Sequence, residues 1–343
     1  MKDFLDSDIE IILKNTKEFV KYFENKSILL TGGNGFIGKY FVEVFKRLNS
    51  QLKKPIKLVI FDKNTRNFKI DKNIELIKKD LSKPFIINKK FDLIIHAAGI
   101  ASPFYYRKNP LETIEVTIEG IKNCLNLAKK NRSKLFYFST SEIYGNPDAV
   151  NVPTNENYNG NVTSIGPRSC YDESKRLGET YCYIHNKYFK THTNIIRPFN
   201  IYGPGMKQND YRIFPNFISN ILKNKELSIY GSGSQTRTYC YITDAIEGFL
   251  RVMCFGKSGE VYNIGNTKPE ISVKEVIKIL EKVHINKIKS KQINYPKSYP
   301  EDEPLRRCPD ISKAKKHLSY KPKISLENGL KNYLFWASKN YKF

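Results

Sequence analysis

The stretch Thr31-Gly32-Gly33-Asn34-Gly35-Phe36-Ile37-Gly38 follows directly on the apolar run Ser27-Ile28-Leu29-Leu30. A short buried strand, a glycine-rich turn and the start of a helix, in this order, are typical of the turn that binds the diphosphate of a dinucleotide. The first glycine permits a tight turn, the second lets the backbone approach the phosphates, and the third lets the helix pack closely on its strand. Backbone N–H groups at the start of the helix can then face the anion. The motif predicts a dinucleotide site that includes Gly32, Gly35, Phe36, Ile37 and Gly38.

Short apolar runs and amphipathic segments alternate after this motif. We expect strands at residues 27–31, 56–61, 74–77, 91–96, 134–139 and 193–197, and helices at about 36–49, 110–131 and 171–190. Alternation of this kind indicates a parallel sheet that is covered by helices on both faces. The predicted fold is therefore α/β, a Rossmann-type doubly wound parallel sheet with a smaller, discontinuous α/β C-terminal substrate domain.

The same pattern sets the expected domain boundaries. Residues 1–25 carry apolar positions at near-helical spacing and are predicted to form an N-terminal helical extension. The alternation weakens after residue 203, so we expect the dinucleotide-binding domain at 26–203 plus 238–256. The second domain is expected at 204–237 plus 257–343.

Composition narrows the class of protein. The 343 residues carry a formal net charge of +24, but the lysines are scattered over nearly every segment, which is typical of a solvated surface and not of a nucleic-acid site. The six cysteines occur singly, without the spacing of metal ligands, and the N-terminus does not resemble a signal peptide. No apolar run approaches the roughly 20 residues that span a bilayer. We therefore expect a cytoplasmic protein without a bound metal, a nucleic-acid partner or a membrane partner.

Several candidate ligand residues follow predicted strands, at the edge where doubly wound sheets bind ligands. Asp62 ends the second strand, where a carboxylate can accept hydrogen bonds from both hydroxyls of an adenosine ribose, which favours NAD over NADP. Asp80 and Leu81 follow the third strand and could flank the adenine. After the fourth strand, Ala97 and Ala98 are small enough for backbone to lie against a flat cofactor.

Tyr171 and Lys175 form the constellation that decides the chemistry. Residues four apart lie on one face of a helix, so the Lys175 ammonium is expected beside the Tyr171 phenol. A neighbouring cation favours the phenolate and would lower the tyrosine pKa from its usual value near 10. The pair therefore predicts a tyrosine that acts as a base.

With these motifs the chain resembles the extended short-chain dehydrogenase/reductase superfamily, in its NAD-dependent epimerase/dehydratase family, over residues 26–335. Within that family it is most similar to the UDP-glucuronate decarboxylases. The resemblance rests on the sequence segments 101–103, 139–145, 165–176, 199–200, 209–210, 231–237 and 306–310, of which 165–176 is the most specific.

The resemblance implies roles for individual residues. Tyr171 would take the proton of the sugar C4 hydroxyl while NAD takes the hydride, Lys175 would also hold the nicotinamide ribose, and Thr140 would hydrogen-bond the C4 oxygen. Ser141 and Glu142 would lie near C5 and C6 of the sugar. The remaining substrate contacts are expected from Ser102, Asn200, Arg237 and Arg307. Of these, Asn200 and Arg237 would lie toward the diphosphate, and the planar fork of Arg307 suits a carboxylate.

The resemblance leaves the reaction open. A ketone at C4 makes a C6 carboxylate a β-keto acid that loses carbon dioxide, which predicts a decarboxylase. If C6 carries a hydroxyl, Glu142 would remove the C5 proton and water would leave, which is 4,6-dehydration; a 4-epimerase is the third alternative. A regulatory protein of this fold would be expected to have lost Tyr171 or Lys175, and both are present.

Two positions depart from the decarboxylase pattern. Glu115 stands where these enzymes commonly have a lysine, and a carboxylate there would repel a uronate; Thr117 stands where relatives often have asparagine. Members of the family also pair through the helices equivalent to 110–131 and 171–190. We therefore expect a homodimer that binds a nucleotide-sugar substrate.

Overall fold

The computed structural model describes residues 4–65, 68, 71–294 and 304–343. A seven-stranded sheet forms its centre, in the order β11-β6-β5-β4-β1-β2-β3, and every neighbouring pair is parallel. Its strands are β1 (Ser27–Thr31), β2 (Lys57–Asp62), β3 (Ile74–Lys78), β4 (Leu93–His96), β5 (Lys134–Phe138), β6 (Thr193–Pro198) and β11 (Val261–Ile264). The predicted doubly wound sheet is confirmed.

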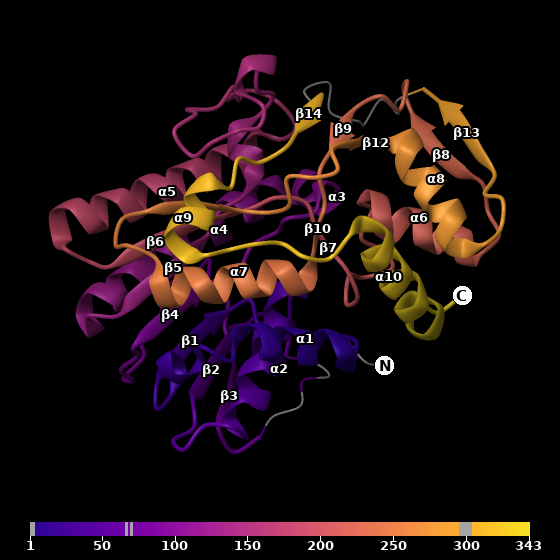
Figure 1. Ribbon diagram of the computed structural model, residues 1–343. Coiled ribbons are helices and arrows are strands. Elements are labelled where there is room, and N and C mark those ends of the chain that lie inside the picture. Colours follow the sequence, from indigo (N-terminus) through magenta and orange to yellow (C-terminus); the bar gives the residue numbers. More distant parts are fainter. Residues whose placement is uncertain (1–3, 66–67, 69–70, 295–303) are drawn as a thin grey trace.

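Helices cover both faces of this sheet (Figure 1). The described residues of the whole chain, the smaller unit included, form the helices α1 (Asp6–Thr16), α2 (Phe36–Asn49), α3 (Pro103–Lys108), α4 (Pro110–Asn131), α5 (Ser169–Phe189), α6 (Ile213–Leu222), α7 (Ile242–Phe255), α8 (Val273–His284), α9 (Ser312–Leu318) and α10 (Leu326–Asn340). They also form the short 3-10 turns η1 (Val20–Phe23), η2 (Ser141–Tyr144) and η3 (Ala149–Asn151). Each helix in the described ranges is too short or too polar to cross a lipid bilayer.

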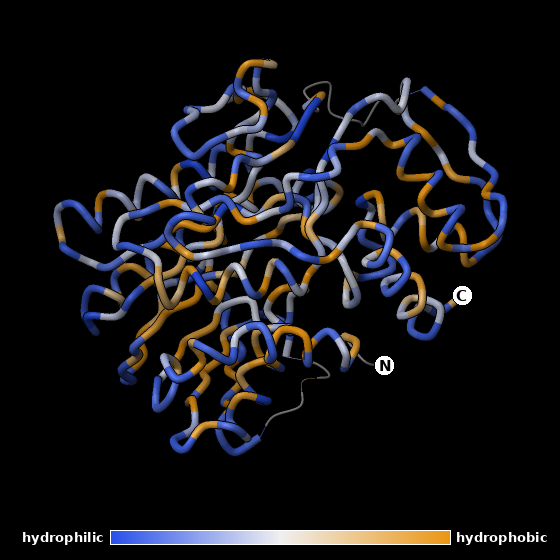
Figure 2. Tube along the Cα trace, in the orientation of Figure 1, coloured by the Kyte–Doolittle hydropathy of each residue, from blue (hydrophilic) through white to orange (hydrophobic). Residues whose placement is uncertain are grey.

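Successive side chains of each strand point to opposite faces of the sheet, which explains why a layer of helices packs on each face. In β1, Ile28 and Leu30 pack with α1, α2 and α7, whereas Leu29 packs with α4 and α5 on the opposite face. Side chains of successive strand residues point to opposite faces, so a continuous apolar run buries both. The central strands are accordingly hydrophobic along their length, and the peripheral loops are hydrophilic (Figure 2).

A smaller unit lies beside the sheet, at the right of Figure 1. It contains α6, α8 and α10 and two small sheets, one of β8 (Leu227–Tyr230) with β13 (Ser290–Ile293), the other of β9 (Thr236–Arg237), β12 (Ile271–Ser272) and β14 (Arg306–Arg307). A parallel pair, β7 (Ile201–Tyr202) and β10 (Cys240–Tyr241), links the two units where the chain leaves and re-enters the large one.

The predicted domain boundary at residue 257 is wrong in one respect. β11 pairs with β6 in parallel and forms the edge of the large sheet, and α9 packs on α7 and β11. β11 has only four residues, and so short a run does not show from the sequence which sheet the strand joins. The second unit therefore contains less of 257–343 than expected.

Candidate active site

The glycine turn joins β1 to α2 with almost no space between them. Gly32 has φ +75°, and a Cβ there would lie 2.7 Å from Ala98 Cα. A Cβ on Gly38 would lie 2.2 Å from Gly32 O. Both positions require glycine: a Cβ on Gly38 would force α2 away from the turn, and a Cβ on Gly32 would meet the backbone of Ala98 at a φ that other residues rarely adopt. The start of α2, at Phe36 and Ile37, is thereby held against the ends of β1 and β4.

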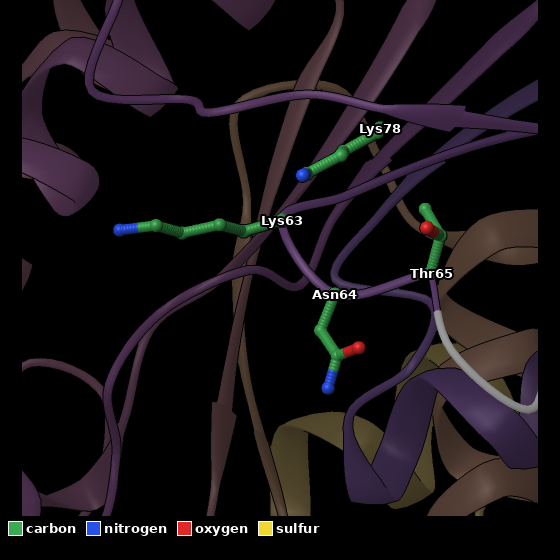
Figure 3. A pocket seen from close by; sticks show the side chains of 4 residues that line it. All are labelled: Lys63, Asn64, Thr65 and Lys78. Carbon is green, nitrogen blue, oxygen red and sulfur yellow. The ribbon is translucent and has the colours of Figure 1, made fainter.

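Asp62 is fixed at the end of β2 by two backbone donors. Its Oδ2 accepts from Asn34 N at 2.8 Å and its Oδ1 from Asn64 N at 2.9 Å. Each carboxylate oxygen has a second acceptor direction, so the residue can still bind hydroxyls. Immediately beyond it lies a pocket that is lined by Lys63, Asn64, Thr65 and Lys78 (Figure 3).

The residues at the ends of β3 and β4 differ in which of their atoms remain able to contact a ligand. Asp80 Oδ1 accepts from the hydroxyl and the backbone N–H of Ser82, and the hydroxyl hydrogen bond is the main reason that its pKa is lowered. Leu81 is a buried core residue. His96 is fully buried with Nδ1 2.7 Å from Thr31 Oγ1, and burial lowers its pKa to about 3, so it is a neutral packing residue that supports Ala97 and Ala98.

Tyr171 and Lys175 lie together on α5, both buried. Lys175 Nζ lies 6.0 Å from the centre of the Tyr171 ring and donates to Phe138 O at 2.7 Å. Burial lowers the pKa of Lys175 to about 8 and raises the pKa of Tyr171 to about 12, against a hydrogen bond from Thr140 that lowers the latter. The prediction that Lys175 brings the tyrosine pKa below its usual value is therefore wrong for the polypeptide by itself, because desolvation outweighs the nearby charges.

Glu142 is held by two arginines. Arg307 Nη1 and Nη2 donate to its two carboxylate oxygens at 2.6 and 2.7 Å, and Arg168 Nη2 donates to Oε2. The Glu142 backbone N–H donates to Thr140 Oγ1 at 3.2 Å, which connects this charge cluster to the partner of Tyr171. The structure thus brings Thr140, which caps η2, and Ser141 and Glu142 of η2 together with Arg307, which lies 165 residues beyond Glu142 in the chain.

Arg168 is the member of this cluster that received no role from sequence. Its Nε lies 3.4 Å from Asp172 Oδ2, one helical turn away. That i, i+4 spacing of opposite charges at the start of a predicted helix is the signal that could have singled it out.

The other predicted substrate residues are Arg237, Asn200 and Ser102. Arg237 pairs in register with Arg307 on neighbouring strands, and its Nη2 donates to Pro304 O at 2.6 Å. Asn200 has φ +46° and its Nδ2 donates to Thr238 O at 2.8 Å. Ser102 Oγ is buried and makes no hydrogen bond within the described residues, so it can serve a ligand.

The two positions that depart from the decarboxylase pattern lie on α4. Glu115 is exposed on α4, and Thr117 is buried with its hydroxyl donated to Thr113 O at 2.7 Å. Within the described ranges, no three His, Cys, Asp or Glu side chains group as metal ligands would.

Comparison with known proteins adds an independent line of support. The sequence profile of the "NAD dependent epimerase/dehydratase family" matches residues 28–265. UDP-glucuronic acid decarboxylase 6 of Arabidopsis thaliana is 37% identical over 327 residues, which are 93% of this chain and 90% of that protein. UDP-glucuronic acid decarboxylase 1 of Xenopus tropicalis is 36% identical over 325 residues, 94% of this chain and 74% of that protein.

Solved structures agree in fold. UDP-glucuronic acid 4-epimerase from Bacillus cereus, in complex with UDP-glucuronic acid and NAD, is 27% identical with a TM-score of 0.74 and covers 92% of this chain and 100% of its own. DesIV, a dTDP-glucose 4,6-dehydratase from Streptomyces venezuelae with NAD bound, has a TM-score of 0.77 at 23% identity over 92% of this chain and 97% of its own. The latter likeness shows the fold alone.

Proposed function

This chain belongs to the NAD-dependent epimerase/dehydratase family, and we propose that it modifies a nucleotide sugar through transient oxidation at C4, most consistently as a decarboxylase of a UDP-glucuronate-like sugar. The observation that carries the choice of reaction is the pair of guanidinium groups, from Arg168 and Arg307, that converge on Glu142 beside Thr140 and Tyr171. Arginine forks match carboxylates, so Arg307, which holds Glu142 when no sugar is bound, would suit the carboxylate of a sugar acid that takes the place of Glu142.

The residues present fit NAD. Gly38 lies close to Gly32, so the backbone at the start of α2 would be able to approach a diphosphate. The Asp62 carboxylate accepts from Asn34 N and would still be able to accept from a ribose. Asp80 and Leu81 would border the adenine, with Ala97, Ala98 and Lys175 toward the nicotinamide ribose. NAD, when bound there, supplies a recycled hydride acceptor for C4 and a cationic ring near Tyr171.

The side chains of this chain would handle the protons and charges. Tyr171 would accept the proton of the C4 hydroxyl, which Thr140 orients, and Lys175 would stabilise the phenolate. With C4 as a ketone, the bond between C5 and the C6 carboxylate would break, carbon dioxide would leave, and the electron pair would pass to the C4 oxygen as an enolate that Arg307 would stabilise. A proton added at C5 and the hydride returned to C4 would complete the product. Asn200, Arg237 and Ser102 would hold the rest of the nucleotide sugar.

Glu142 distinguishes this reaction from 4,6-dehydration. As a dehydratase base it would have to take the C5 proton, but Oε2 already accepts from both arginines, and Oε1, which accepts from Arg307, keeps only one acceptor direction. Decarboxylation requires no such base. The alternative is kept because Thr140-Ser141-Glu142 also suits dehydration, and a substrate that draws Arg307 away would release Glu142.

The test is incubation of the purified protein with UDP-glucuronate, GDP-mannose and dTDP-glucose in parallel, with products read by mass. Loss of carbon dioxide from UDP-glucuronate alone is the expected result. Loss of water from either hexose would establish the dehydratase, and an isomer of unchanged mass would indicate an epimerase. The Tyr171→Phe variant serves as the inactive control.

We further propose that the protein is a homodimer through α4 and α5. Leu177, Tyr181, Ile184 and Tyr188 follow helical spacing on α5, and Tyr188 is 68% exposed. A stripe of this kind on one helix face is typical of a covered surface. Sedimentation should give a dimer, and Tyr188→Glu should shift it toward a monomer; a monomeric parent protein at micromolar concentration would refute the interface.

A further inference from the structure

A second tyrosine lies flat against the proposed base. Tyr106 of α3 stacks on Tyr171 with ring centres 5.0 Å apart and an interplanar angle of 4°, and the two residues are 1% and 4% exposed. An offset stack of two buried rings restricts the rotation of both side chains. The direction of the Tyr171 phenol therefore depends on where α3 places Tyr106.

The backbone of α3 reinforces this contact. Cys170 Sγ lies 3.6 Å from Tyr106 O as a donor, so α3 meets two consecutive residues of the first turn of α5. The short helix begins with Pro103, and Arg107 Nε donates to Pro103 O at 3.0 Å. Proline in the first turn and this return hydrogen bond stabilise a helix that would be marginal by length alone.

The residues just before Tyr106 make a different contact. Phe104 lies 4.1 Å from Tyr211, ring centre to ring centre, and Tyr105 Oη donates to Asn209 O at 3.2 Å. Asn209 and Tyr211 belong to residues 203–212, the segment that leads from β7 to α6 of the smaller unit. We call Phe104, Tyr105 and Tyr211 the aromatic clasp.

The clasp is a surface feature. Phe104 is 37% exposed and Tyr211 is 54% exposed, so these rings join two segments without being part of the core. The segment that they hold also carries Arg212, which forms a two-point ion pair with Asp210 at 2.9 and 2.6 Å. The Arg212 charge acts to lower the pKa of Tyr171.

We propose, on the basis of the function inferred above, that Tyr106 is a positioning residue for Tyr171 and that the aromatic clasp couples this positioning to the smaller unit. When the clasp is formed, α3 and residues 203–212 are held together, and the phenol lies in its working direction. When the clasp opens, α3 is released and the base loses its orientation.

The test compares Tyr106→Leu, Tyr106→Phe and Tyr211→Ala in the full-length protein, with Phe335→Ala as a control. Phe335 is an exposed aromatic residue on α10, outside the clasp. A misplacement of a reacting group by 1 Å can cost about 100-fold in rate. Tyr106→Leu should therefore lower kcat by about tenfold or more with little change in KM, and Tyr106→Phe, which keeps the ring, should restore most of it.

A second readout does not depend on any sugar. Hydrogen exchange followed by mass spectrometry should show faster exchange of α3 and of the first turn of α5 in Tyr211→Ala, and no change there in Phe335→Ala. Normal kcat in Tyr106→Leu, equal damage from Tyr106→Phe, or unchanged exchange of α3 in Tyr211→Ala would each overturn the proposal. If the parent protein does not convert UDP-glucuronate but α3 and the first turn of α5 still exchange faster in Tyr211→Ala, the proposed function is refuted and the positioning role is retained.

Discussion

Replacement of Arg307 by glutamine tests the chemistry of the site most directly. The Arg307 side chain is 8% exposed and donates two hydrogen bonds to Glu142. Hydrogen bonds to charged groups are worth about 1.5–3 kcal/mol each. If the fork serves the sugar carboxylate during turnover, two lost bonds amount to at least about 3 kcal/mol, and kcat/KM for UDP-glucuronate should fall by roughly 100-fold or more.

Stability should respond much less than activity. Removal of the only partner of a buried charge costs about 3–5 kcal/mol, but Glu142 keeps Arg168, so we expect a loss of about 1–2 kcal/mol in the free energy of unfolding. The matched control is Arg306→Gln, since Arg306 is the adjacent residue, is 42% exposed and pairs with Glu270 at 2.8 Å. Steady-state kinetics and denaturant unfolding of both variants provide the assay. A kcat/KM in Arg307→Gln within about threefold of the Arg306→Gln value would refute the assigned role.

Three further outcomes follow from the structure. Tyr171→Phe should abolish turnover with any nucleotide sugar and leave NAD affinity nearly unchanged by calorimetry; normal rates would remove Tyr171 from the mechanism. Gly38→Ala should prevent NAD binding, because the added Cβ would lie 2.2 Å from Gly32 O, and a normal NAD content of the purified variant would contradict this. Burial raises the Asp8 pKa from 3.8 to about 7. Its protonated form is therefore favoured by folding, and stability present at low pH is lost as the pH rises toward 7, by on the order of 4 kcal/mol at most. Asp8→Asn should flatten the dependence of the unfolding free energy on pH between 4 and 7. The control Asp6→Asn, at a side chain that is 43% exposed, should not flatten it. Equal slopes in both variants would exclude Asp8 as the cause.

Local sequence predicted the parts of the site that are local in space. The glycine turn, the helix spacing of Tyr171 and Lys175 and the strand-end position of Asp62 each depend on a few consecutive residues and on the regular geometry of one element. The apolar strands likewise had to be buried on both faces, and the parallel sheet followed. Steric and hydrogen-bonding rules within short segments were sufficient for these predictions.

Other features depend on contacts that no short segment contains. β11 joins the large sheet by pairing with β6, and nothing in a run of four residues reveals that partner. The cluster of Glu142, Arg168 and Arg307 draws on three separate places in the chain, η2, the residue before α5, and β14, and its geometry arises only when β14 lies next to β9. Helix α3 was not expected either, since six residues give too short a window for a periodicity to be read.

The Tyr171 pKa shows why placement alone does not determine chemistry. Sequence correctly places a cation one turn from the phenol, yet burial acts on both groups and moves each toward its neutral form, the tyrosine upward and the lysine downward. The interaction of charges grows as water is excluded, so a further charge placed next to the phenol in this buried site would act strongly on its pKa. Lys175 Nζ donates to Phe138 O and lies 6.0 Å from the centre of the Tyr171 ring. We therefore expect positive charge that arrives with the ligands to add to that of Lys175 in favouring the phenolate, so that Tyr171 is a stronger base in the loaded cleft than in the empty one.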